Sequence, residues 1–220
     1  MTRRTNHQLA LTELDHPLVR HHLTRLRDVD TEPEEFRRLV GRLAVLLAAE
    51  ATRDLDVKPK TIRTPLATVR GAAIAGRIGL IPILRAGLGM VDPVLELIPS
   101  AEVWHLGVYR DESTHRPVEY YNKLPATDPV DVALVLDPML ATGGSVIAAL
   151  ATLKEWQVPV VKILSIISAR DGVREVHSHF PQVQIYTCAI DAKLNSRKFI
   201  VPGLGDAGDR QFNTTPRGDG

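Results

Sequence analysis

Residues 132–145 include a carboxylate, two hydroxyl side chains and two glycines, which are residue types that suit the binding of phosphate and sugar groups. Five apolar residues at 132–136 are typical of a buried strand, and Asp137 stands where that strand would end. A short loop with hydroxyl side chains follows, and residues 146–153 then have the apolar spacing of a helix. Such a strand–loop–helix turn directs backbone N–H groups and a helix N-terminus at one point, which suits a phosphate. The carboxylate of Asp137 can accept hydrogen bonds from ribose hydroxyls.

We call residues 137–145 the phosphate loop, and their sequence is Asp-Pro-Met-Leu-Ala-Thr-Gly-Gly-Ser. It has no Gly-Lys-Ser/Thr, as ATPase P-loops have, and lacks the Gly-x-Gly-x-x-Gly spacing of dinucleotide folds. It resembles the loop that binds 5-phospho-α-D-ribose 1-diphosphate (PRPP) in the type I phosphoribosyltransferases, and specifically that of the uracil phosphoribosyltransferase family. A strand that ends in Asp before a Gly-Gly turn also occurs in α/β proteins that bind nothing there. The resemblance implies PRPP contacts from Asp137, Pro138, Met139, Leu140, Ala141, Thr142, Gly143, Gly144 and Ser145.

A second motif, the diphosphate loop (residues 82–90), reads Pro-Ile-Leu-Arg-Ala-Gly-Leu-Gly-Met. It follows a predicted strand and opens a helix. Gly87 and Gly89 let backbone amides approach an anion closely, and Arg85 adds a charge that does not titrate. The family resemblance implies that this loop holds the diphosphate of PRPP through Arg85. It also implies a non-proline cis peptide near Arg85-Ala86.

Residues 107–125 resemble the flexible flap of the same family at both ends, with Tyr109-Arg110 at the start and Tyr, Lys, Leu and Pro at the end. Closure of such a flap would exclude water from a sugar–diphosphate bond that hydrolyses easily. The resemblance gives Arg110 a place on the diphosphate and a catalytic role. The alternative is a solvated loop with ordinary charges.

The base loop (residues 200–210) reads Ile-Val-Pro-Gly-Leu-Gly-Asp-Ala-Gly-Asp-Arg. Its glycines argue against a stable helix or a central strand, and they let main-chain groups reach a small planar ligand edge-on. The resemblance implies that Asp206 also contacts the phosphoribosyl substrate as a catalytic residue, whereas Asp209 is expected to lie in a plain surface turn. The uracil-binding residues that it implies are Ile200, Gly205, Asp206 and Ala207.

These loops require strands and helices that position them. Because strands and helices alternate, we predict an α/β fold with a mostly parallel central sheet flanked by helices, resembling the type I phosphoribosyltransferases. A β-rich flap and a base-binding hood near the C-terminus complete it, and ligands bind beyond the carboxyl ends of the strands. Residues 16–213 form the domain, between a loosely ordered segment (1–15) and a tail (214–220). Helices are predicted at 16–27, 31–53 with a Thr31 cap, 92–98, 145–156 and 173–179, and strands within 58–75 and at 79–84, 102–109, 132–137, 160–168 and 185–190.

Composition excludes several other classes of protein. The chain has 220 residues, a formal charge of +1 and mixed signs along its length, which argues against a nucleic-acid partner. The longest apolar run, 43–49, is far shorter than the roughly 20 residues of a membrane helix, and no signal peptide is apparent. The single cysteine, Cys188, reads as a core thiol and fits a reducing cytoplasm. His177 and His179 have the spacing of one strand face but no further ligands, and the Arg-Gly-Asp at 217–219 reads as chance.

The family resemblance implies that uracil and PRPP give UMP and diphosphate in pyrimidine salvage, with Asp137, Arg110 and Asp206 as catalytic residues. Mg²⁺ is expected on substrate oxygens and water, with no protein metal site. Many type I enzymes carry two adjacent acids where this chain has Asp137-Pro138, a difference shared by uracil-specific members. The alternatives are a phosphoribosyltransferase for another base and an RNA-binding pyrimidine-operon regulator on the same fold. The resemblance also implies a homo-oligomer, a dimer or larger, and leaves a GTP effector open.

Overall fold

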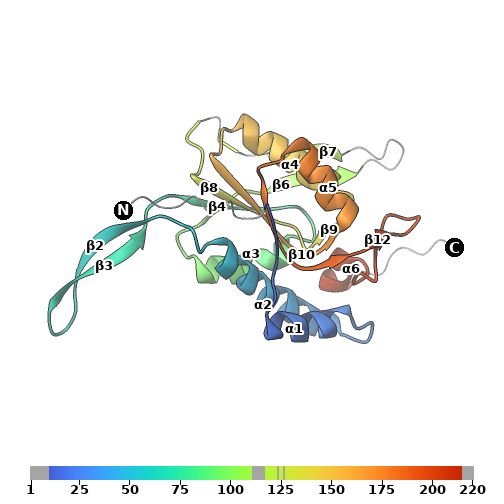
Figure 1. The fold of residues 1–220 in the computed structure, drawn as a ribbon, viewed down its shortest axis with the longest axis horizontal. Coiled ribbons are helices and arrows are strands. Elements are labelled where there is room, and N and C mark those ends of the chain that lie inside the picture. Colours follow the sequence, from blue (N-terminus) through green and yellow to red (C-terminus); the bar gives the residue numbers. More distant parts are fainter. Residues whose placement is uncertain (1–9, 111–116, 123, 126, 215–220) are drawn as a thin grey trace.

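The computed structural model describes residues 10–110, 117–122, 124–125 and 127–214. Its centre is a seven-stranded sheet in the order β1-β11-β10-β8-β4-β5, with the short β9 also paired to β10, and every pairing in it is parallel (Figure 1). The strands are β1 (Leu11–Glu13), β4 (Ile78–Pro82), β5 (Glu102–Val103), β8 (Val132–Leu136), β9 (Met139–Leu140), β10 (Val160–Ala169) and β11 (Gln184–Asp191). The predicted parallel α/β sheet is therefore confirmed.

Helices cover both faces of this sheet (Figure 1). One face carries α1 (Pro17–Arg27), α2 (Pro33–Ala51) and α3 (Leu88–Leu97), and the other carries α4 (Gly144–Glu155) and α5 (Arg170–His179). Each layer has its own hydrophobic core against the sheet, which is why β4 is buried along its whole length. No helix in the described part of the chain is long and apolar enough to cross a membrane.

Three two-stranded hairpins lie outside the central sheet. The first, β2 (Val57–Arg63) with β3 (Thr68–Ile74), extends away from the body of the molecule (Figure 1). The second, β6 (Leu106–Arg110) with β7 (Pro117–Asn122), stands where the flap was predicted. The third, β12 (Lys193–Leu194) with β13 (Ile200–Val201), leads into the base loop and the short α6 (Ala207–Phe212).

Three local predictions were wrong. Residues 11–13 are not loose but form β1, which pairs with β11. Thr31 does not cap α2: Glu32 is the N-cap residue, and the Thr31 hydroxyl donates to the Arg25 carbonyl. The base loop is helical from Ala207, although glycine argued against it. By contrast, the helix predicted at 173–179 is confirmed, and His177 and His179 lie in the last turn of α5.

The strand predicted at 102–109 is also wrong, because it is two strands. The chain breaks at Trp104, whose ring packs edge-to-face on Trp156 with the ring centroids 5.9 Å apart. After this break β6 keeps one parallel bridge to the sheet, between Leu106 and Ile83, and otherwise pairs antiparallel with β7. The flap hairpin therefore begins just after Trp104.

Candidate active site

The phosphate loop forms a turn between the carboxyl end of β8 and the start of α4. Gly143 is the N-cap residue of α4 and has φ +85°, a conformation that favours glycine. The Leu140 N–H donates to the Ser165 hydroxyl at 3.1 Å, and Gly172 of α5 comes so close to the Ala141 carbonyl that a Cβ there would overlap it. These contacts hold the loop in place.

A small cavity of about 70 Å³ opens into this turn. The first residues of α4 line it, and the N–H groups at the start of a helix have no partner within their own helix. The predicted residue Pro138 does not line the cavity, because it is buried and its carbonyl accepts the Ile167 N–H at 3.0 Å. The cavity is lined by Asp137, Met139, Leu140, Ala141, Thr142, Gly143, Gly144, Ser145 and Val146. All but the last of these belong to the predicted PRPP set.

Asp137 is the titratable group of this cavity. Its side chain is partly buried and accepts one hydrogen bond, from the Met139 N–H at 3.2 Å. Burial raises the pKa of Asp137 to about 7, because removal of water disfavours the charged form more than the single hydrogen bond restores it. The carboxyl group therefore changes charge close to neutral pH, and donors from a ligand would favour its charged form.

The diphosphate loop lies beside the phosphate loop, since β4 and β8 are neighbours. The Ile83 N–H donates to the Leu136 carbonyl at 3.0 Å, and a Cβ at Gly87 would overlap that same carbonyl. Gly87 is thus needed for packing on the end of β8, in addition to any approach to an anion. The predicted non-proline cis peptide is present one bond earlier than expected, between Leu84 and Arg85.

Arg85 is half exposed and is held by Asp209 of the base loop and by Thr214 after it. Its Nη2 lies 2.9 Å from Asp209 Oδ1, and its Nη1 donates to the Thr214 hydroxyl at 3.3 Å. The Thr214 hydroxyl and the Arg85 guanidinium together lower the pKa of Asp209. The prediction of a plain surface turn at Asp209 was wrong, and the ion pair joins two loops that are 124 residues apart.

The base loop has an unusual backbone geometry. The Val201-Pro202 peptide is cis, Gly203 has φ +64° and Gly205 has φ +77°. The Asp206 side chain caps α6 by accepting the Asp209 N–H at 2.9 Å. The side chains of Ile200 and Ala207 are buried in the core, so their main-chain groups are what they offer to a ligand.

An ion pair between Arg27 and Asp191 stabilises the base loop. Arg27, at the end of α1, makes two hydrogen bonds to Asp191, of 2.8 and 2.7 Å, and a third of 2.9 Å to the Gly203 carbonyl. The Gly203 N–H donates to the same carboxylate at 3.0 Å. Arg210 adds bonds from its Nη1 to the carbonyls of Leu26 and Leu204. The sequence carries no local signal for these contacts, because the partners of Arg27 are more than 160 residues away.

Other predicted groups have different outcomes. The β6–β7 hairpin places the backbone of Arg110 at the end of β6, while its side chain and Lys123 lie outside the described residues. Cys188 is buried, and burial raises its pKa to about 12, so the prediction of a core thiol is confirmed. His177 contacts the Val183 carbonyl through Nε2 at 3.1 Å.

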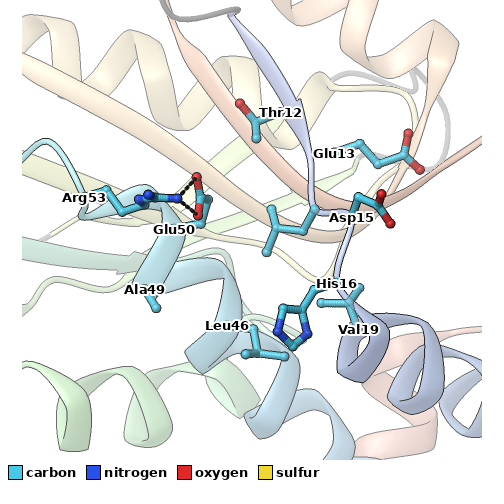
Figure 2. A pocket seen from close by; sticks show the side chains of 10 residues that line it. Thr12, Glu13, Asp15, His16, Val19, Leu46, Ala49, Glu50 and Arg53 are labelled. Atoms are coloured by element: carbon cyan, nitrogen blue, oxygen red, sulfur yellow. Dashed lines mark hydrogen bonds and ion pairs between the residues drawn. The ribbon is translucent and has the colours of Figure 1, made fainter.

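A larger hollow of about 520 Å³ lies away from these loops, between β1, the start of α1 and the end of α2 (Figure 2). Glu50 and Arg53 on its wall form an ion pair with each other at 3.1 Å, and the His16 side chain caps α1. None of the predicted site residues lines it. The hollow is larger than the cavity at the phosphate loop, but the predicted site residues lie at the phosphate loop.

The parallel sheet, with its phosphate loop and diphosphate loop at the carboxyl ends of β8 and β4, defines a type I phosphoribosyltransferase. Solved structures show the same fold. An adenine phosphoribosyl transferase from Trypanosoma brucei matches with a TM-score of 0.55 at 9% identity, over 91% of this chain and 90% of that one. The AQ2163 protein from Aquifex aeolicus matches with a TM-score of 0.88 at 35% identity, over 93% of this chain and 99% of that one.

Within this class, the chain belongs to the uracil phosphoribosyltransferase family. The family model for uracil phosphoribosyltransferase matches residues 13–214. The uracil phosphoribosyltransferase of Roseiflexus castenholzii is 59% identical over 199 residues, which are 90% of this chain and 96% of that protein. The family membership that the loop motifs predicted is therefore confirmed.

Proposed function

We propose that the protein transfers the phosphoribosyl group of PRPP to uracil and releases diphosphate, which is the UMP-forming step of pyrimidine salvage. The observation that carries this proposal is the convergence of three loops. The diphosphate loop bonds to the end of β8, where the phosphate loop starts, and its Arg85 pairs with Asp209 of the base loop. A phosphate, a diphosphate and a base are the three groups that this reaction must hold in line.

The chemistry assigns a role to each loop. The uracil N1 loses its proton and bonds to C1′ of the ribose, while the bond from C1′ to the diphosphate oxygen breaks. Positive charge develops on the sugar and negative charge on the leaving group, so cations and N–H groups at the diphosphate lower the barrier. Arg85 and Arg110 serve the diphosphate, and the N–H groups of residues 142–145 serve the 5′-phosphate. Asp137 accepts the ribose hydroxyls, and Asp206 faces the phosphoribosyl group.

Base recognition falls to main-chain groups of Ile200, Gly205, Asp206 and Ala207. The buried side chains of Ile200 and Ala207 support this assignment, because only the backbone of these residues is free to face a ligand. Backbone donors and acceptors cannot exchange roles, as the side-chain amide of Gln or Asn can by rotation. The site would therefore read the acceptor–donor–acceptor edge of uracil.

Mg²⁺ is proposed to enter on the diphosphate oxygens of PRPP, with water completing its shell. The part of the chain that the structure describes has no group of three or more His, Cys, Asp or Glu side chains that could hold a metal. The ion would neutralise part of the charge on the departing diphosphate.

A homo-oligomer, a dimer or larger, is proposed from the projecting β2–β3 hairpin. Every residue of β2 is exposed, as are the apolar side chains of Val57 (60%), Leu66 (97%) and Val69 (46%). An isolated two-stranded hairpin is marginal in water, so a second copy of the chain is the proposed cover. Light scattering should show a smaller particle for the double variant Leu66→Ser, Val69→Ser and no change for Val29→Ser, an exposed residue outside the hairpin. An unchanged mass in the double variant would refute this role.

Two further assignments follow from the family resemblance and the composition. A cytoplasmic location is proposed, because one buried cysteine fits a reducing compartment. GTP is proposed as an effector, and a titration of the initial rate with GTP tests it. A rate that does not change with GTP overturns that assignment.

The central experiment measures UMP formation from labelled uracil with and without PRPP, beside the same assay with orotate and hypoxanthine. We expect turnover with uracil that depends on PRPP and on Mg²⁺. A gel shift with pyrimidine-operon RNA runs in parallel, because an RNA-binding regulator is the alternative on this fold. RNA binding without uracil turnover would overturn the enzymatic assignment.

A further inference from the structure

Gln211 lies between the diphosphate loop and the base loop. Its side chain, near the end of α6, is fully buried. The amide nitrogen Nε2 donates to two carbonyls at 3.0 Å each, that of Ala86 in the diphosphate loop and that of Ala207 at the start of α6. One side chain thus bonds the backbone of both substrate loops, which are separated by more than 120 residues in the chain.

The orientation of this amide is set by its partners. Both neighbours of Nε2 are carbonyl oxygens, which only accept hydrogen bonds, so the NH₂ end must face them. The other end, Oε1, has no hydrogen-bond partner among the residues that the structure describes, and it points at Gly89. A Cβ at position 89 would overlap Oε1, so the second glycine of the diphosphate loop makes room for Gln211.

Two further contacts fix the arrangement. The backbone carbonyl of Gln211 accepts a hydrogen bond from Arg37 of α2 at 2.6 Å, which anchors α6 to the helical layer. The Arg85–Asp209 ion pair joins the same two segments closer to solvent. The Arg85 side chain is half exposed, whereas the Gln211 side chain is fully buried. Gln211 is therefore the connection between the two segments that is shielded from solvent.

We propose that Gln211 is a positioning residue that couples the PRPP site to the uracil site. Movement of the Ala86 carbonyl when the diphosphate loop closes on PRPP is transmitted through Nε2 to Ala207, whose main chain faces the base. PRPP would then increase the affinity for uracil, and by thermodynamic linkage uracil would increase the affinity for PRPP by the same factor. This inference rests on the proposed assignment of the two loops to diphosphate and base.

The test measures that factor by calorimetry. The probes are PRPP and a uracil analogue with carbon in place of N1, which keeps the O2, N3–H and O4 edge but has no atom to attack C1′. Each Kd is measured alone and in the presence of the other ligand. For the wild type we expect mutual tightening of about fivefold or more. Gln211→Met keeps the length and burial but removes both donors, so the factor should fall below about twofold, with the Kd of PRPP alone changed less than about threefold.

The matched control is Gln182→Met, the same replacement in an exposed turn, which should keep the wild-type factor. Wild-type coupling in folded Gln211→Met overturns the inference. So does a wild type that binds both ligands independently, and in that case the proposed function stands. Absence of binding by either ligand to the wild type refutes the proposed function instead.

A second measurement needs no variant and keeps the inference testable if Gln211→Met does not fold. Hydrogen exchange of the wild type is followed with each ligand alone. We expect PRPP to slow exchange in residues 203–212, and the uracil analogue to slow exchange in residues 85–90. Protection confined to each ligand's own loop would refute the coupling.

Discussion

Replacing Asp137 with Asn removes a carboxyl group whose negative charge is disfavoured by its burial in the phosphate loop. Burial raises the pKa of Asp137 from its ordinary value near 3.8 to about 7, so the folded protein holds this proton more tightly than the unfolded chain. The resulting stability is fully present below about pH 4. It declines as the pH rises toward 7 and is lost above the folded pKa.

The magnitude follows from the shift. One pKa unit corresponds to about 1.4 kcal/mol, so the interval from pH 5 to pH 7 removes at most about 2.7 kcal/mol from the wild type, and solvent at the partly exposed carboxyl makes about 2 kcal/mol the expected value. Asn cannot titrate, yet its Oδ1 can still accept the Met139 N–H. The two proteins should therefore share a fold and differ in their dependence on pH.

The assay is urea unfolding of the ligand-free wild type and Asp137→Asn at intervals from pH 5 to pH 8. The difference in unfolding free energy, wild type minus variant, should fall by about 2 kcal/mol across that range. If the unfolding free energies of the two proteins changed in parallel with pH, the pKa of Asp137 would not lie within this range. That result would refute the burial argument.

The same substitution tests the role of Asp137 toward PRPP. Ribose hydroxyls donate to the carboxylate, so PRPP should bind the charged form and its affinity for the wild type should rise between pH 6 and pH 8. Asp137→Asn should lack that component, apart from the titration of PRPP itself. It should also lose at least about tenfold in kcat/KM at pH 8, because a charge-assisted contact contributes roughly 1.5–3 kcal/mol. Wild-type turnover in a folded variant would remove Asp137 from the site.

Three other outcomes are expected. The kcat/KM for uracil should exceed those for cytosine and hypoxanthine by at least about a thousandfold, because a base with a different hydrogen-bonding edge leaves buried main-chain groups unpaired. Comparable turnover of cytosine would refute the assignment of the base loop to uracil. Arg27→Met should weaken uracil binding at least about tenfold with little change for PRPP, since Asp191 and Gly203 lose their shared partner; equal losses for both ligands would indicate a general defect. Lys162→Met should lower the unfolding free energy by about 2 kcal/mol, since the buried ammonium bonds the Ala51 carbonyl at the end of α2 and pairs with Asp54; an unchanged urea midpoint would contradict this.

Local pattern was enough to predict much of the molecule. The apolar run of β8, the phosphate loop after it and the apolar spacing of α2 are properties of adjacent residues, and each forms near its predicted place. Local pattern also places the phosphate loop and the diphosphate loop at one edge, because right-handed parallel connections bring the carboxyl ends of strands together.

Tertiary structure decided the features that depend on a distant partner. Residues 11–13 have little strand character of their own and become β1 only because β11 offers a free edge. Glycine argued against a helix at 207–212, yet the Asp206 cap and the buried Gln211 stabilise α6 there. The ion pair of Arg85 with Asp209 joins residues that no local pattern relates. Periodicity and motif depend on neighbours in the chain, whereas side-chain pairing depends on which surfaces the fold brings into contact.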